Sequence, residues 1–145
     1  MTLSIPPLYD VLIDEDSKAN LNWTIFFQNI AEGDSGDVWS PTFINLGTSG
    51  SPTYTGRYYQ ISKYICFFTV TIFTNGGNTT STAGTTYIDN FPLIMQSDSV
   101  CFVGTGSGAV QAIGGIRSAD KRIYPPGWSS VTENLTIVGI INTVG

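Results

Sequence analysis

The residue types that carry most enzyme chemistry are sparse in this sequence. Its 145 residues include no histidine and only two cysteines. Ser35 lies in Gly33-Asp34-Ser35-Gly36, a setting similar to that of a nucleophilic serine, but such a serine needs a base, usually histidine, to take its proton. No pair of carboxylates stands in a context that suggests acid–base work. We therefore predict no catalytic residues and no enzyme activity.

The two thiols, Cys66 and Cys101, each sit inside an apolar run, at residues 64–68 and 100–103. Their separation fits neither a zinc site nor a CxxC redox motif. Small buried hydrophobes with free thiols are the favoured interpretation. A disulfide stays open at this point, because it would form only if the two strands paired with suitable geometry.

Metal and cofactor motifs are also incomplete. The acidic runs Asp14-Glu15-Asp16 and Asp34 to Asp37 lack the spacing and the closing glutamate of a calcium-binding loop, so surface acids and helix capping explain them. Residues 104–109 have the GxGxxA pattern of dinucleotide-binding loops, but Gly114-Gly115 interrupts the helix that should follow. A glycine-rich hairpin is favoured there. We predict no metal and no cofactor.

Charge is scarce and unevenly placed. Charged residues make up 12% of the chain, against about 25% in ordinary soluble domains. Residues 1–37 hold seven carboxylates and the single Lys18, a net charge of −6, whereas the remainder is at +1. No cluster of Lys and Arg favours nucleic acid, and no apolar run is long enough to span a bilayer. So low a charge indicates surface hidden against copies of the chain or a partner, and we expect an oligomer.

An apolar arm and a short helix are predicted at the N-terminus, and we assign residues 1–37 to this unit. Pro6-Pro7 extends the arm, and its side chains Leu8, Tyr9 and Leu12 are candidates for anchoring it on another surface. We expect no signal peptide, because the start is not basic and the two prolines break the apolar run.

The helix is predicted over residues 17–32. One apolar stripe at i, i+3, i+4 and i+7 gives it a candidate oligomer interface. A three-helix cluster and a helix docked on the rest of the chain both fit this stripe, whose residues are Trp23, Phe26, Phe27 and Ile30.

The remainder, residues 38–145, is predicted to be a β-sandwich domain. The strongest signal lies at residues 63–74, where Cys66, Phe68, Val70 and Ile72 alternate with a second set rich in threonine. Many short strands separated by turn residues favour a jelly-roll-like sandwich. Residues 78–86 are interpreted as a polar loop. The other strands are expected at residues 42–46, 53–60, 85–88, 99–105, 109–116, 122–124 and 135–143.

Aromatic residues among glycine, threonine and asparagine can stack on sugar rings or form an interface. For most of them a core or subunit-interface position is favoured. The rigid loop Tyr124-Pro125-Pro126-Gly127-Trp128 is the best candidate for a surface contact, through Tyr124 and Trp128.

Two stretches carry a resemblance to known proteins. The segments Pro6-Pro7-Leu8-Tyr9, residues 21–28, Gly33-Asp34-Ser35-Gly36 and Trp39-Ser40-Pro41-Thr42-Phe43 resemble small virion proteins of bacteriophages. Residues 52–67 are similar to the "G.Y..IGK.V.F...I" run in the β-sandwich heads of tail fibres and head fibres, with Ser62 in place of the usual glycine. Asp89-Asn90-Phe91-Pro92 stands where those heads often carry an "NLP"-like turn.

The resemblance implies a homotrimeric virion component with a jelly-roll-like head and an N-terminal anchor. The first hypothesis is a tail-fibre-like appendage protein that attaches to other virion proteins through residues 1–32 and faces the host, where a surface glycan is a candidate ligand. It would be assembled in the host cytoplasm and reside in the virion. A capsid decoration or cement protein is the second hypothesis, and a lectin-like carbohydrate-binding module is the third.

Overall fold

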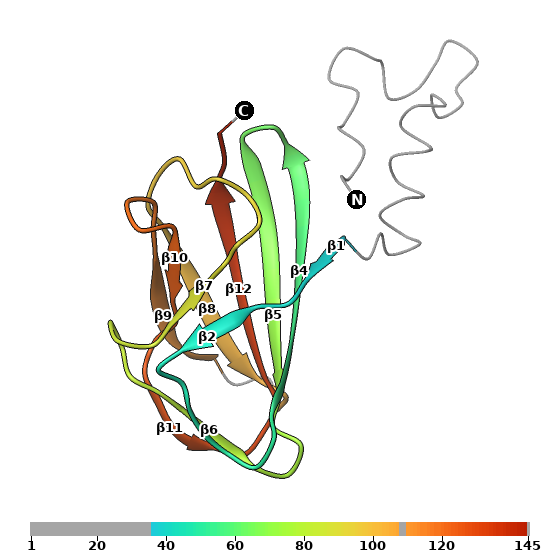
Figure 1. Ribbon diagram of the computed structural model, residues 1–145, viewed down its shortest axis with the longest axis vertical. Coiled ribbons are helices and arrows are strands. Elements are labelled where there is room, and N and C mark those ends of the chain that lie inside the picture. The colour runs from blue at the N-terminus through green and yellow to red at the C-terminus, as the bar shows by residue number, and fades with distance from the viewer. Residues whose placement is uncertain (1–35, 108–109, 145) are drawn as a thin grey trace, which may run out of the picture.

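The computed structural model describes residues 36–107 and 110–144, and every regular element in them is a β-strand (Figure 1). The mainly β prediction is thereby confirmed. The predicted arm and the helix over residues 17–32 lie outside the described residues. The strands are β1 (Asp37–Trp39), β2 (Thr42–Ile44), β3 (Gly47–Ser49), β4 (Thr53–Ser62), β5 (Ile65–Phe73), β6 (Asn78–Ser81), β7 (Tyr87–Asp89), β8 (Ser99–Thr105), β9 (Val110–Arg117), β10 (Arg122–Tyr124), β11 (Trp128–Val131) and β12 (Leu135–Asn142).

Nine strands form one curled antiparallel sheet in the order β1-β4-β5-β12-β8-β9-β10-β7-β2. Its two outermost strands, β1 and β2, are consecutive in the chain, so the sheet curls into a half-barrel and its edges meet at Ser40-Pro41 (Figure 1). Asn90 holds this junction, because its side-chain oxygen accepts the N–H of Thr42 at 2.9 Å and its amide donates to the carbonyl of Ser40 at 2.8 Å.

A second sheet of three strands, in the order β11-β6-β3, lies at the lower end of the molecule in Figure 1. Its central strand is β6, so the prediction of a polar loop over residues 78–86 is wrong for residues 78–81. Threonine is β-branched and fits a pleated sheet well. Thr79 and Ser81 point inward and are buried, whereas Asn78 and Thr80 are half-buried.

Thr86 ties the loop after β6 to the body of the domain. This residue is fully buried, and its hydroxyl donates to the carbonyl of Asn45 and accepts the N–H of Thr82, both at 2.9 Å. A single buried side chain therefore satisfies backbone groups of two loops that are about forty residues apart in sequence.

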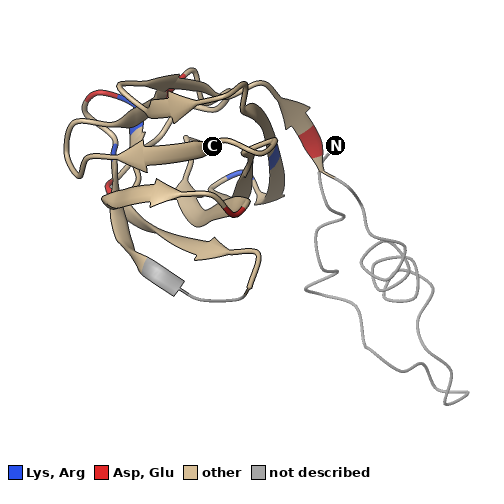
Figure 2. Ribbon diagram, turned by 90° about the horizontal axis from the view of Figure 1, so that it is seen from below, with Lys and Arg blue, Asp and Glu red and all other residues tan. Residues whose placement is uncertain are grey.

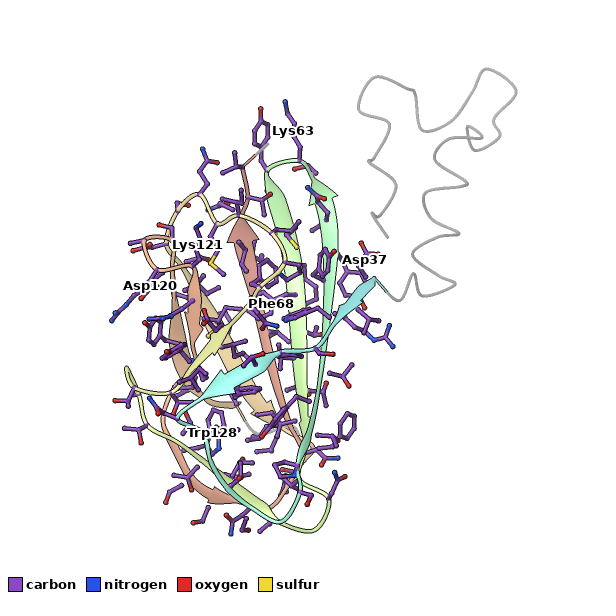
Figure 3. The ribbon with its side chains drawn as sticks, in the orientation of Figure 1. Asp37, Lys63, Phe68, Asp120, Lys121 and Trp128 are labelled. Carbon is purple, nitrogen blue, oxygen red and sulfur yellow. The ribbon has the colours of Figure 1, made fainter. Side chains whose placement is uncertain are left out.

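The core is filled by the inward face of the central strands, as their period of two predicts. On β5 the inward side chains are Cys66, Phe68, Val70 and Ile72, all fully buried. Phe68 lies in the middle of the curled sheet (Figure 3). Its ring packs 6.4 Å from that of Trp39 and 5.8 Å from that of Phe91, which closes the open side of the half-barrel near the β1–β2 junction.

Glycines give these aromatic rings the room they need. A β-carbon on Gly139 would lie 2.7 Å from the ring of Phe68, and one on Gly56 would lie within 2.6 Å of three atoms of the Trp39 ring. On β9, a β-carbon on Gly114 would meet Tyr124, Cys101 and Pro125, but one on Gly115 would meet nothing within 4 Å. Side chains are therefore excluded at Gly56, Gly114 and Gly139, and the backbone at these three positions approaches the core directly.

Cys66 and Cys101 are free and buried, in agreement with the favoured interpretation of the sequence. They lie on β5 and β8, which β12 separates in the sheet. Burial raises the pKa of the Cys66 thiol to about 11 and that of Cys101 to about 12. Both side chains therefore behave as small apolar groups.

Candidate binding surface

The three adjacent central strands β5, β12 and β8 carry no charged residue. Their sequences, of 9, 8 and 7 residues, contain no Asp, Glu, Lys or Arg on either face. Figure 2 shows most of the ribbon in tan, the colour of uncharged residues, with short blue and red segments. The inward face forms the core, but the outward face also lacks charge, although the surface of a small soluble domain usually has about a quarter to a third charged residues.

The register of the sheet gathers apolar side chains on this outward face. Val138 of β12 pairs with Phe102 of β8, which in turn pairs with Ile113 of β9. Ile140 of β12 pairs with Phe67 of β5. Several of these side chains are about half exposed, at 63% for Ile113, 52% for Ile140, 48% for Val100 and 43% for Phe102.

A shallow groove of about 400 Å³ lies on the same face. The only side chain in its lining with a polar atom is Ser99, whose hydroxyl donates to the carbonyl of Ile140 at 2.7 Å. No group in the lining is therefore placed to act as an acid, a base or a nucleophile, and the groove suits apolar contact. Its lining residues are Phe67, Ser99, Val100, Phe102, Val138, Gly139 and Ile140.

The apolar row continues to the edge of the sheet. Tyr59 of β4 pairs with Phe67, and their ring centroids are 5.9 Å apart. Gly36, the first described residue, lies over the Tyr59 ring, since a β-carbon on it would be 2.8 Å from that ring. The chain therefore enters the sheet beside the outward end of this row.

Charged and aromatic side chains gather instead at β7, β9 and β10. The guanidinium of Arg122 stacks 4.1 Å from the ring centroid of Tyr87, and Arg117 stacks 4.5 Å from that of Tyr124. Asp120 accepts the hydroxyl of Tyr124 at 2.6 Å. A hydrogen bond with Tyr124 is the main cause that raises the pKa of Arg122. These mutual contacts stabilise the turn between β9 and β10.

The predicted surface contact at Tyr124 and Trp128 is wrong, because both side chains are buried, with 8% and 6% of their surface exposed. Tyr124 packs between Arg117 and Tyr87, whose ring centroid is 5.6 Å away. The indole N–H of Trp128 donates to the hydroxyl of buried Thr79 at 3.1 Å, at the end of the domain occupied by the small sheet (Figure 3). Pro125 and Pro126 are buried as well.

The other candidate site residues cannot be placed, because they lie outside the described residues. They are the anchoring and interface candidates Leu8, Tyr9, Leu12, Trp23, Phe26, Phe27 and Ile30. The outward apolar face was missed as a site by sequence reasoning. The available signal was the continuous apolar run in Val100-Cys101-Phe102-Val103 and Ile137-Val138-Gly139-Ile140-Ile141, which has no polar alternate positions.

Within residues 36–107 and 110–144, no three His, Cys, Asp or Glu side chains come together in a way that could hold a metal ion. No helix among the described residues is long and apolar enough to cross a membrane.

Comparison with known proteins found no match: no family model, no curated protein and no solved structure is significantly similar to this chain. The functional argument therefore depends on the residues and on the surface described above.

Proposed function

We propose that this chain is a non-enzymatic structural component of a bacteriophage particle. In this role it is a tail-fibre-like appendage protein that attaches through its N-terminal arm and presents a homotrimeric, jelly-roll-like β head for host recognition or as an adaptor. The observation that carries the proposal is the uncharged apolar face on the outside of an all-β domain, because such a face suits permanent assembly better than a free monomer.

The uneven distribution of charge supports different roles for residues 1–37 and for the β domain. Residues 1–37 carry a net charge of −6, more than the −5 of the whole chain, together with the apolar side chains Leu8, Tyr9 and Leu12. These features suit a segment that lies on another virion protein, with its apolar groups against the partner and its carboxylates toward solvent. The β domain, by contrast, is close to neutral and suits contacts with copies of itself.

The resemblance to virion proteins, whose matching segments cover most of residues 5–92, supports the same assignment from an independent direction. The structure of the residues that carry it is compatible with a head: residues 53–62 and 65–73 form the long β4–β5 hairpin, and Asn90 of the "NLP"-like segment holds the β1–β2 junction. The proposed location is the virion, after assembly in the host cytoplasm. A host surface glycan is a candidate ligand of the head.

The test is incorporation into particles of the phage that encodes the chain. Leu8→Asp/Leu12→Asp should reduce the amount of protein in purified particles at least tenfold, measured by quantitative immunoblot, because the arm loses its apolar contacts. The matched control, Ser4→Asp/Ser17→Asp, adds the same charge at polar positions and should be incorporated normally. Far-ultraviolet circular dichroism should show the same β-sheet signal for all variants.

Normal incorporation of the arm variant would overturn the anchoring role, and absence of the wild-type protein from particles would overturn the virion assignment. Gold-labelled antibody on intact particles then separates the two virion roles. Label on the tail supports the appendage, whereas label over the capsid would establish the decoration protein in its place.

A further inference from the structure

We infer that the outward face of the central strands is a contact surface between copies of this chain. This self-association face consists of Phe67, Val100, Phe102, Ile113, Val138 and Ile140. The inference gives the homo-oligomer of the proposed function a specific interface. It concerns the purified protein in solution and is tested separately from attachment to a particle.

The position of the face determines how copies can meet. Strands β5, β12 and β8 each have a hydrogen-bonded neighbour on both sides, so their backbone groups are already paired. A second chain therefore cannot join here by adding a strand to an edge. It has to pack side chain against side chain, as two sheets do at a spacing of about 10 Å.

The absence of charge makes the face suitable for contact with a second copy of the same chain. An acidic or a basic protein would need opposite charges at the centre of this face, and these three strands offer none. Two identical faces that carried charge of one sign would repel each other. Because these strands carry no charge, two copies can meet here without that repulsion. Arg57 on β4 and Arg117 at the end of β9 lie on neighbouring strands, outside this uncharged region.

The size of the face matches the centre of a stable interface. Four of its side chains are about half exposed, and with roughly 150 Å² available on a large apolar side chain they present about 300 Å². A standard interface covers ~800 Å² on each partner, with an apolar centre and a polar rim. Tyr59, Thr69 and Thr136 border the apolar rows and are suited to form part of that rim.

The shape of the face provides a complementary pair of features. Ile113 is the most exposed of its side chains, and it lies beside the groove without lining it. The groove is lined by Phe67, Phe102 and Ile140 among others. We place Ile113 of one copy in the groove of the next. In this arrangement each copy inserts its own Ile113 and also receives the Ile113 of a neighbouring copy.

Photo-crosslinking of the full-length protein tests this placement. p-Benzoylphenylalanine replaces Ile113, and equal amounts of unlabelled and ¹⁵N-labelled protein are unfolded together in urea and refolded before irradiation, so that both kinds of chain enter one assembly. The expected product is a covalent dimer with one light and one heavy chain, crosslinked to peptides that contain Phe67, Phe102 or Ile140. The same probe at Ser129, an exposed position on β11 of the small sheet, should give no such dimer.

Crosslinks confined to residues 1–35 of the same chain would overturn the inference, because the N-terminal segment would then be the occupant of the face. Failure to form any mixed covalent dimer would overturn it as well.

A native-mass measurement by light scattering gives the second readout. Ile113→Asp and Ile140→Lys should weaken self-association at least 100-fold and leave mainly monomer, with the melting profile of a folded β domain. Val38→Asp is the matched control, because Val38 is also apolar and is 61% exposed but lies on the edge strand β1. A wild-type monomer at high concentration, or equal loss of mass in all three variants, would rule the interface out. Particle incorporation could still succeed in that case, so the two failures are distinguishable.

Discussion

Adding one methyl group at Gly114 should destabilise the domain far more than adding the same group at the neighbouring Gly115. The two glycines are consecutive on β9, so their added β-carbons point to opposite faces of the sheet. At Gly114 the methyl would point inward, against the carbonyl oxygen of Tyr124, 2.8 Å from the sulfur of Cys101 and 2.9 Å from the carbonyl carbon of Pro125. At Gly115 it would find open space.

The size of the destabilisation by Gly114→Ala depends on which of the neighbouring atoms can move away from the new methyl group. Two of the three atoms that meet the new methyl group belong to the backbone of a buried segment, so the clash is relieved only by shifting β9 relative to the strand that follows it. Overpacking of this kind costs about 1–3 kcal/mol, and the backbone neighbours place Gly114→Ala at the upper end of that range. Gly115→Ala should be neutral or stabilising by roughly 0.5 kcal/mol, since alanine loses less backbone entropy than glycine.

The assay is thermal and urea unfolding of both variants and the wild type at one protein concentration, followed by circular dichroism. One kcal/mol shifts the melting temperature of a domain of this size by about 4–8 °C, so Gly114→Ala should melt roughly 10 °C or more below the wild type. Gly115→Ala should melt within about 3 °C of it. Equal melting temperatures for the two variants would refute the claim that the backbone at Gly114 packs directly against the β10–β11 segment.

Three further predictions concern buried hydrogen bonds and titratable groups. Thr86→Val should cost about 1–3 kcal/mol in urea unfolding because it removes both hydrogen bonds of a buried hydroxyl, to Asn45 and from Thr82. Thr85→Val at an exposed neighbour should change little, and equal effects would contradict the role of the Thr86 hydroxyl. Because burial raises the pKa of Cys66 to about 11 and of Cys101 to about 12, both thiols should resist a disulfide-exchange reagent at pH 8 until urea unfolds the chain. The free energy of unfolding should also fall as the pH rises above the unfolded thiol value of about 8.5, and the double alanine variant should lack that fall. Hydrogen bonds from the backbone and hydroxyl of Ser118 lower the pKa of Asp98. The ionised Asp98 carboxylate therefore stabilises the fold above the ordinary carboxyl pKa, and this effect is lost as the pH falls through the pKa of Asp98 in the folded state. Asp98→Asn should make the urea midpoint depend less on pH between pH 6 and 3, and an unchanged acid dependence would contradict this.

The strands that sequence reasoning located best are those with strong local patterns. The alternation at residues 63–74 corresponds to β5 at Ile65–Phe73, and the apolar runs at residues 99–105 and 135–143 correspond to β8 and β12. In such segments the period of two and the β-branched side chains act over a few residues, so neighbours in sequence suffice to predict the strand.

The strands that were missed are short and depend on distant partners. β1, β3, β6 and β11 have only three or four residues each. The small sheet joins segments that begin at residues 47, 78 and 128. No local pattern in a run such as Asn78-Thr79-Thr80-Ser81 specifies these pairings, because the stabilising hydrogen bonds come from chain segments that only the fold brings together.

The burial of Tyr124 and Trp128 shows the same limit for side chains. A loop with two prolines, a glycine and two aromatic residues has the composition of an exposed turn. In the structure it leads from β10 into β11, and both aromatic side chains find hydrogen-bond partners, Asp120 and Thr79. Composition therefore did not predict which way the aromatic side chains of this loop point.

By itself the sequence determined the all-β character of the described domain, the inward positions of its strongest strands and the shortage of charge, because each depends on composition or on a pattern a few residues long. Only the tertiary structure decided that β5, β12 and β8 lie side by side. These segments are far apart in the chain, and their outward side chains become one surface solely through the order and register of the sheet. The candidate interface is thus a product of strand pairing between distant segments, which no local pattern encodes.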